Sequence, residues 1–510
     1  MIARGLRILV AYGTLGFATV AVCASLGATA GAQASRPLDR QLETQGRPWP
    51  SERPPRPVDA PPVKFPPYEL RKLPNGLQVV IVSHHEQPSV SVRMIVRAGA
   101  AQDPKGKMGT AMLAATLLDQ GAGSRTAEHI ADAIDFVGGI LSTGAGTDLT
   151  YISAVVLKDS LPLALELMSD VVRRPTFAQD ELDRQRQQAL SGMKVSAEDP
   201  DTVANRVFDR LIYGFHPYGL PGNGTVESLS SITRADLVEF HRRYFVPNNA
   251  LIAVVGDVKA EEAMAGLTKA FGEWQQGSVP AFQPIDAPPP TKRVIVVDRP
   301  DAVQTEIRIG QIGIPRRHAD FLAMDQAVKI LGGEGGNRLQ QVLRSQRGLT
   351  YGASAELQTY KMAGGIRAET DTRTDATAEA LRLAVDEFYR LQRERVYEGE
   401  LEGAQAYLAG HFPLTIETPD AIATQVLNHL FYELPLDELQ TYPERVRSVS
   451  PDDVQRVARA YLRPDRLTVV LVGNADAFVK DLRGVGFGEF ERIPMDRIDL
   501  LAADLKKPNR

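Results

Sequence analysis

An internal duplication constrains the fold of this chain more than any other feature of its sequence. The second half contains SPDDVQRVARAYLRPDRLTVVLVGNA, and the first half contains a segment of the same pattern, TRADLVEFHRRYFVPNNALIAVVGDV. At one offset of 217 residues, the matched pairs are Thr233 and Ser450, Asp236 and Asp453, Tyr244 and Tyr461, Pro247 and Pro464, and Gly256 and Gly473. Five matches without a gap indicate that the halves are copies of one structural unit.

Each copy predicts an N-capped amphipathic helix, a proline turn and a β-rich strand that ends at glycine. The same offset places LQVVIV (77–82) on VIVVDR (294–299), the predicted opening strand of each half. Between these landmarks, strand patterns such as TYISAVVL alternate with helix patterns such as DSLPLALELMSDVVRR. The sequence therefore predicts an α+β fold of two homologous halves, each a β-sheet packed with helices.

The remaining segments predict the domain boundaries. Residues 1–34 carry two arginines before an apolar run, and Ala32-Gln33-Ala34 fits a cleavage site, so we predict a secretory signal peptide. An uncleaved membrane anchor over residues 8–30 is the alternative. Proline-rich composition predicts a tether over 35–67 and a linker over 280–292. We therefore expect two domains of similar length at 68–279 and 293–497, followed by a tail at 498–510.

Composition excludes two classes of function. The net charge of −5 shows no basic bias, which argues against a nucleic-acid partner. The single cysteine, Cys23, lies in the predicted signal peptide, so we expect neither disulfides nor thiol chemistry in the mature chain. Val22 is bulky where a lipoprotein signal needs a small residue, which argues against lipidation.

Four stretches together resemble the pitrilysin/insulinase family of zinc peptidases, in its processing-peptidase-like small-subunit branch. They span residues 68 to about 490 and read YELRKLPNGLQVVIV, FHPYGLPGNGTVESLSSITRADLVEFHRRYFVPNNALIAVVGDV, LGGEGGNRLQQVLRSQRGLTYG and GHFPLTIETPDAIATQVLNHLFYELPLDEL. The resemblance implies two halves that face each other like a clam shell around a chamber.

The resemblance also implies a zinc site, and this sequence lacks its ligands. Family enzymes carry H-x-x-E-H on the helix after the glycine that matches Gly109; two histidines bind zinc, the glutamate activates water, and a later glutamate is the third ligand. The corresponding positions hold Met112, Ala115, Thr116 and Gly192. Because zinc needs protein ligands with lone pairs, we expect no metal in this chain.

The histidines give the same expectation without an alignment. No two of them lie four positions apart, so no helix presents a metal-binding pair; they are residues 84, 85, 129, 216, 241, 318, 411 and 429. A loop site at His84-His85 is the alternative to a solvated strand end. The glycine-rich LGGEGGNRL lacks the lysine and hydroxyl of a phosphate loop, so we interpret it as a turn before a helix over 337–347.

The second half retains another family motif. In active chains an arginine and a tyrosine seven residues apart, around G-L-x-Y, bind the substrate carbonyl and stabilise the developing oxyanion. The stretch RSQRGLTY supplies Arg344 and Tyr351 at that spacing; the alternative is a helix-end arginine and a strand aromatic. The family's substrate-binding edge strand usually begins with Asn-Ala, whereas Ser142 and Thr143 stand here, which weakens the case for peptide binding by the first half.

These features predict a non-catalytic subunit of a secreted, periplasmic, heteromeric zinc peptidase. The zinc is expected in a pitrilysin-family partner, to which this chain presents Arg344 and Tyr351 for a peptide substrate. By itself the chain would be an inactive homologue without a cofactor, and it would meet a membrane only if the signal segment stays uncleaved. The alternatives are a stand-alone peptide-binding or chaperone-like protein and a structural scaffold like the core proteins of respiratory complexes.

Overall fold

The structure is a computed structural model that describes residues 64–281, 283–333 and 336–508. These residues belong to one compact unit, residues 61–510. The predicted signal peptide (1–34) and residues 35–63 of the predicted tether lie outside the described residues. Within the described ranges, no helix combines the length and the apolar character needed to cross a bilayer.

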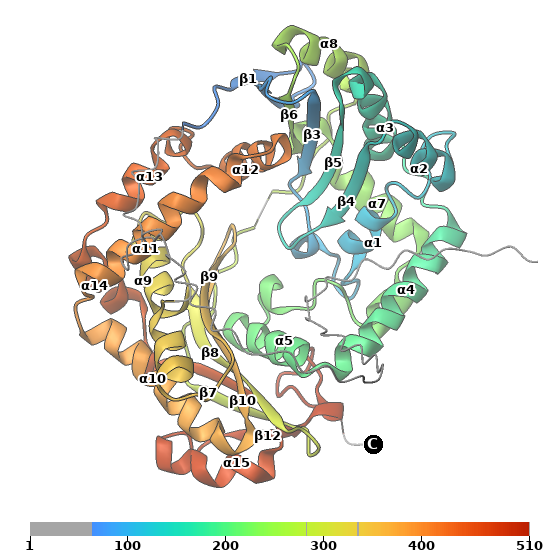
Figure 1. The fold of residues 1–510 in the computed structure, drawn as a ribbon. Coiled ribbons are helices and arrows are strands. Elements are labelled where there is room, and N and C mark those ends of the chain that lie inside the picture. Colours follow the sequence, from blue (N-terminus) through green and yellow to red (C-terminus); the bar gives the residue numbers. More distant parts are fainter. Residues whose placement is uncertain (1–63, 282, 334–335, 509–510) are drawn as a thin grey trace, which may run out of the picture. The chain divides into compact units, whose positions relative to one another are not determined.

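Two six-stranded sheets form the framework of the fold (Figure 1). The first has the order β1-β2-β6-β3-β5-β4, with β1(Glu69–Lys72), β2(Gln78–Ser83), β3(Ser89–Val96), β4(Ile140–Ala145), β5(Thr150–Leu157) and β6(Ala250–Gly256). The second has the order β12-β7-β11-β8-β10-β9, with β7(Arg293–Asp298), β8(Gln304–Gly313), β9(Ala353–Thr359), β10(Gly364–Arg373), β11(Thr468–Gly473) and β12(Glu491–Pro494). In both sheets the opening strand pairs in parallel with the strand that ends the repeat, β2 with β6 and β7 with β11.

Helices follow the strands in both halves. The first half contributes α1(Thr110–Thr116), α2(Ala127–Phe136), α3(Leu161–Arg173), α4(Gln179–Glu198), α5(Pro200–Tyr213), α6(Val226–Ser231), α7(Arg234–Tyr244) and α8(Ala260–Phe271). The second half contributes α9(Phe321–Gly332), the π-helix η5(Gln340–Gln346), α10(Thr377–Arg393), α11(Glu398–His411), α12(Pro419–Phe431), α13(Glu438–Ser448), α14(Pro451–Tyr461) and α15(Ala475–Leu482). Sheets packed with helices in both halves confirm the predicted fold class.

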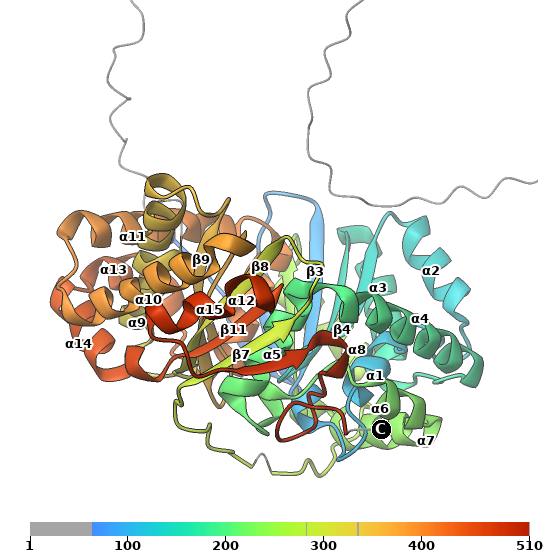
Figure 2. The same ribbon diagram turned by 90° about the horizontal axis from the view of Figure 1, so that it is seen from below.

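Each sheet buries both of its faces. Along β2, Val79 and Ile81 enter the core formed with α1, α2, α3, α7 and α8, whereas Val80 and Val82 enter a second core on the opposite face. This division follows from the alternation of side chains along a strand. The second sheet packs one face in the same way against α9, α10, α14 and α15, which gather on one side of it in Figure 2.

The second face of each sheet is covered by a helix from the other half. Helix α5 packs on β8 and β11, and helix α12 packs on β3 and β6, where Figure 1 shows it in orange. Both helices begin with proline at the first helical position, directly after the N-caps Asp199 and Thr418. The halves therefore exchange equivalent helices, which explains why residues 61–510 form one compact unit.

The duplicated segments fold alike, with one correction to their alignment. Helices α7 and α14 each begin with a capping box, and β6 and β11 follow them. However, β2 pairs Gln78 with Leu251, whereas β7 pairs Arg293 with Thr468, so the opening strands are offset by 215 residues and not by 217. Because side chains alternate with a period of two, a two-residue shift leaves the hydrophobic pattern unchanged, and the sequence pattern cannot reveal it.

Candidate functional site

Helix α1, which carries the family's zinc-motif positions, has a sharply defined start. Gly109 has φ +92°, and a Cβ there would lie 2.7 Å from Leu229 Cδ2, so only glycine fits. The Asp103 carboxylate accepts hydrogen bonds from the N–H groups of Gly109 (2.6 Å) and Ala111 (2.8 Å). Burial raises the pKa of Asp103 to about 7 even though these backbone hydrogen bonds act in the opposite direction.

The four motif positions offer no set of metal ligands. Ala115 is fully buried, and the Thr116 hydroxyl donates to the Met112 carbonyl oxygen of its own helix (2.9 Å). Gly192 lies on α4, which contacts α1, and a Cβ there would meet no heavy atom within 4 Å. Across the described part of the chain, no three His, Cys, Asp or Glu side chains gather as a metal site would require. The residues therefore do not fit the zinc ion that the family's active members bind.

One of the two edge strands of the first sheet is β4, which holds Ser142 and Thr143. The Thr143 hydroxyl donates to the Ala115 carbonyl oxygen (2.8 Å) and so ties this strand to the motif helix. Ser142 lies opposite Ser153 of β5. The strand that binds substrate in the resembling family is therefore present as a free edge, but it carries these hydroxyl residues.

The structure brings Arg344 and Tyr351 together. The Arg344 guanidinium carbon lies 4.7 Å from the centroid of the Tyr351 ring, and Tyr351 is 83% exposed. Neither the guanidinium nor the phenol hydroxyl has a hydrogen bond or ion pair with the residues that the structure describes. Arg344 lies on the π-helix η5, and such helices are rare and frequently found at functional sites. The pair thus presents one cationic and one hydroxyl donor to the outside.

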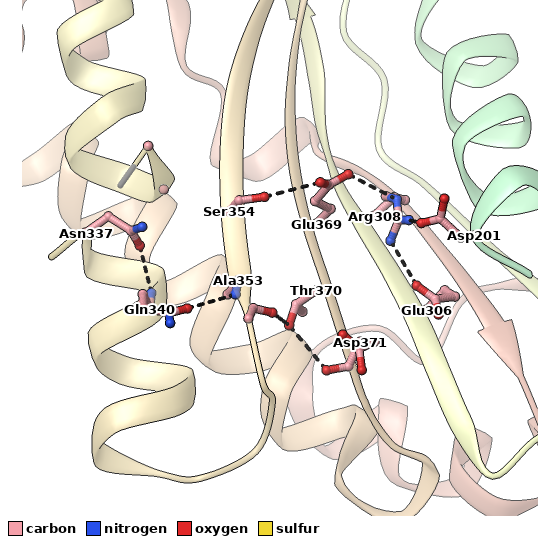
Figure 3. A pocket seen from close by; sticks show the side chains of 13 residues that line it. Asp201, Glu306, Arg308, Asn337, Gln340, Ala353, Ser354, Glu369, Thr370 and Asp371 are labelled. Carbon is pink, nitrogen blue, oxygen red and sulfur yellow. Dashed lines mark hydrogen bonds and ion pairs between the residues drawn. The ribbon is translucent and has the colours of Figure 1, made fainter. Parts of the chain in front are cut away.

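A pocket of about 420 Å³ adjoins this segment, between η5 and strands β8, β9 and β10 (Figure 3). The carboxylates of Asp201, Glu306, Glu369 and Asp371 line it together with Arg308. Arg308 is 2% exposed and contacts Asp201, Glu306 (3.4 Å) and Glu369 (3.7 Å). Burial raises the pKa of Glu306, and Arg308 opposes that shift. One arginine among four carboxylates leaves an acidic pocket that suits a cationic group.

A second cavity of about 260 Å³ lies at the motif helix. Met112 lines it, as do Arg206 and Asp209 of α5 and Tyr360 of the turn between β9 and β10. Nearby, His216 caps a short 3-10 turn by accepting a hydrogen bond from the Tyr218 N–H (3.2 Å). Shortly after β2, His85 Nδ1 lies 2.6 Å from Asp257 Oδ1, within hydrogen-bond distance.

Comparisons with known proteins decide the family. Residues 78–225 match the insulinase (peptidase family M16) model, and residues 231–408 match the peptidase M16 inactive domain. Together these matches span more than half of the chain.

The chain belongs to the insulinase family.

Relatives within the insulinase family match this chain along most of their length. An uncharacterized zinc protease of Mycobacterium leprae is 29% identical over 68% of this chain and 78% of its own length. The non-peptidase homolog YmxG of Helicobacter pylori is 24% identical over 78% of this chain and 91% of its own length. The crystal structure of a peptidase M16 inactive domain from Pseudomonas fluorescens is 28% identical, covers 80% of this chain and 98% of its own, and has a TM-score of 0.75. With Met112, Ala115, Thr116 and Gly192 at the motif positions, the chain fits a non-catalytic peptidase homologue of the insulinase family.

Sequence reasoning missed three residues that shape these sites. Arg308 stands between Ile307 and Ile309, which is the ordinary alternation of a half-exposed strand, so the sequence does not show that its side chain is buried. Arg206 and Asp209 occur three residues apart on an amphipathic helix. Such a pair is ordinary in a sequence, because the sequence does not show that both line a cavity.

Proposed function

We propose that this chain is the non-catalytic subunit of a heteromeric zinc peptidase. It would close the chamber of a partner that bears H-x-x-E-H and contribute Arg344 and Tyr351 to that partner's substrate. The predicted signal peptide makes the periplasm the compartment of the complex. The observation that carries the proposal is the exposed Arg344–Tyr351 pair, whose donor groups have no hydrogen-bonded partner within the described residues.

The chemistry of the pair supports this role. A guanidinium and a phenol hydroxyl are the donors that can stabilise negative charge as it develops on a substrate carbonyl oxygen. Neither group can hydrolyse a peptide without an activated water molecule. The motif positions of this chain provide no residues that would activate one. A zinc-bearing partner would supply the activated water, and the two chains would divide one active site between them.

Affinity purification of the chain from its native source tests the proposal. We expect a family member bearing H-x-x-E-H to co-elute, and the reconstituted pair to hydrolyse a generic peptide that neither chain cleaves alone. Elemental analysis should find zinc in the partner and none bound stoichiometrically to this chain. Peptide hydrolysis by this chain alone, or purification without any such partner, would contradict the proposal.

A further inference from the structure

The cavity at the motif helix is built from both halves of the chain. Met112 of α1, Ala145 at the end of β4 and the loop around Leu220 come from the first half, and Tyr360 comes from the second. Tyr218 also lines the cavity, and its hydroxyl donates to Asp148 (2.7 Å) and accepts from the Met362 N–H (3.1 Å). These contacts fix the walls of the cavity, so its shape is set by the fold.

Arg206 lines this cavity as an unpaired cation. Its guanidinium makes no hydrogen bond, ion pair or ring contact with any residue that the structure describes. Burial lowers the pKa of Arg206, and no acidic group opposes that shift. A half-buried guanidinium without a partner carries a desolvation cost that an anionic ligand would offset.

Asp209 lines the same cavity one helical turn further along α5. Its Oδ1 is buried and has no hydrogen-bond donor among the described residues, and its nearest cationic atom, Arg367 Nη1, is 3.9 Å away. Residues three apart on a helix lie on the same side, yet Arg206 and Asp209 form no ion pair with each other. The cavity therefore contains one unpaired cation and one poorly paired anion, side by side.

We propose that this cavity binds a small zwitterion, a free α-amino acid or a dipeptide, with its carboxylate at Arg206 and its ammonium at Asp209. The cavity places a positive and a negative side chain next to each other, and a zwitterion carries an ammonium and a carboxylate that are also close together. Met112, Ala145, Leu220 and the rings of Tyr218 and Tyr360 supply an apolar wall for the ligand's side chain. Methionine at a position where active relatives need histidine makes that wall apolar and adaptable. The binding needs no partner subunit, so it can be tested independently of the proposed function.

A thermal-shift screen of the purified mature chain tests this inference. The probes are each standard amino acid and L-leucylglycine, and calorimetry follows for every probe that raises the melting temperature. We expect at least one zwitterion to bind, and its N-acetylated and amidated derivatives to bind about tenfold more weakly or worse. Comparison of leucine with leucylglycine separates a free amino acid from a peptide end. The inference is overturned if no probe binds at millimolar concentration, or if the blocked derivatives bind as well as the zwitterion.

Two variants locate the binding charges. Arg206→Gln and Asp209→Asn should each lower the affinity for the zwitterion by about tenfold or more, because each removes one ion pair to the ligand. The matched controls are Arg382→Gln and Asp386→Asn, an exposed ion pair on α10, which should leave the affinity unchanged. Circular dichroism checks that all four variants are folded. Wild-type affinity in both cavity variants would refute the assignment.

Discussion

Single substitutions of Arg344 and Tyr351 test the proposal that this chain is a peptidase subunit. Arg344→Ala removes a charged donor and should lower turnover by the reconstituted two-chain complex by roughly 10²–10³. Tyr351→Phe removes only the hydroxyl, so it separates the hydrogen bond from the stacking of the ring on Arg344. The measurement is peptide turnover, with assembly checked by gel filtration. If both variants assemble and cleave at the wild-type rate, the chain is a scaffold.

Asp209 should make the free chain less stable as the pH rises. Burial raises the pKa of Asp209 to about 6, whereas an unfolded aspartate titrates near its usual 3.8. The folded state therefore holds the proton more tightly, and stability falls as the pH rises from about 4 through about 6. Asp209→Asn removes the charge, so its melting temperature should exceed that of the wild type at pH 8. The difference should shrink towards pH 4.5.

Thermal melts across this pH range show which of two opposing effects on the Asp209 carboxylate is larger, its desolvation or its attraction to Arg367. A lower melting temperature for Asp209→Asn at pH 8 would mean that attraction to Arg367 outweighs the cost of desolvation. The expected result also strengthens the ligand test, because a variant that folds more stably cannot lose binding through unfolding.

The sequence could predict single site residues only where a family motif includes them. The resemblance to the insulinase family pointed to Arg344 and Tyr351 as a pair, and the structure places the Arg344 guanidinium over the Tyr351 ring. Arg206 and Asp209 carry no such signal. Their significance depends on Met112, Tyr218 and Tyr360, which reach the same cavity from distant parts of the chain.

At the level of elements, the two exchanged helices use the same electrostatic contact. Each carries an aspartate at its second position, where negative charge favours the helix N-terminus. Asp201 of α5 contacts Arg308 of β8, and Asp420 of α12 accepts from Arg93 of β3 (3.1 Å). The hydroxyls of Ser91 and Ser153 donate to Asp420 as well. The duplication has thus preserved an acid–arginine pair on each side of the exchange.

Asp420→Ala should destabilise the protein because it leaves Arg93 and two serine hydroxyls without their acceptor. We expect a loss of roughly 1–3 kcal/mol in the free energy of unfolding. Asp386→Ala, which breaks an exposed i,i+4 pair on α10, is the control and should cost only about 0.3–0.5 kcal/mol. Chemical denaturation measures both. Equal effects would show that the contact between α12 and the first sheet is no stronger than a surface pair.

Local patterns predicted the type of most elements but not their partners. The capping residues Thr233 and Ser450 correctly indicated the starts of α7 and α14. The apolar face of an amphipathic helix shows that it packs on something, and it does not show on which sheet. Consequently the sequence did not predict the exchange of α5 and α12. It also did not reveal that β2 and β7 are related by an offset of 215 residues and not 217.

For the whole molecule, the exchange predicts that neither half folds alone. Residues 64–290 would expose the face of the first sheet that α12 covers, and residues 291–510 would expose the face that α5 covers. We expect each piece expressed by itself to aggregate or bind a hydrophobic dye, and the two pieces expressed together to form a soluble complex. A cooperative thermal transition from either piece alone would contradict this.

The exchanged helices also determine at what stage of folding the first sheet becomes covered on both faces. The last strand of the first sheet ends at Gly256, but the second face of this sheet is covered only when α12, which ends at Phe431, can reach it. Until α12 packs there, the chain displays an apolar sheet face that a chaperone in the compartment of folding can bind.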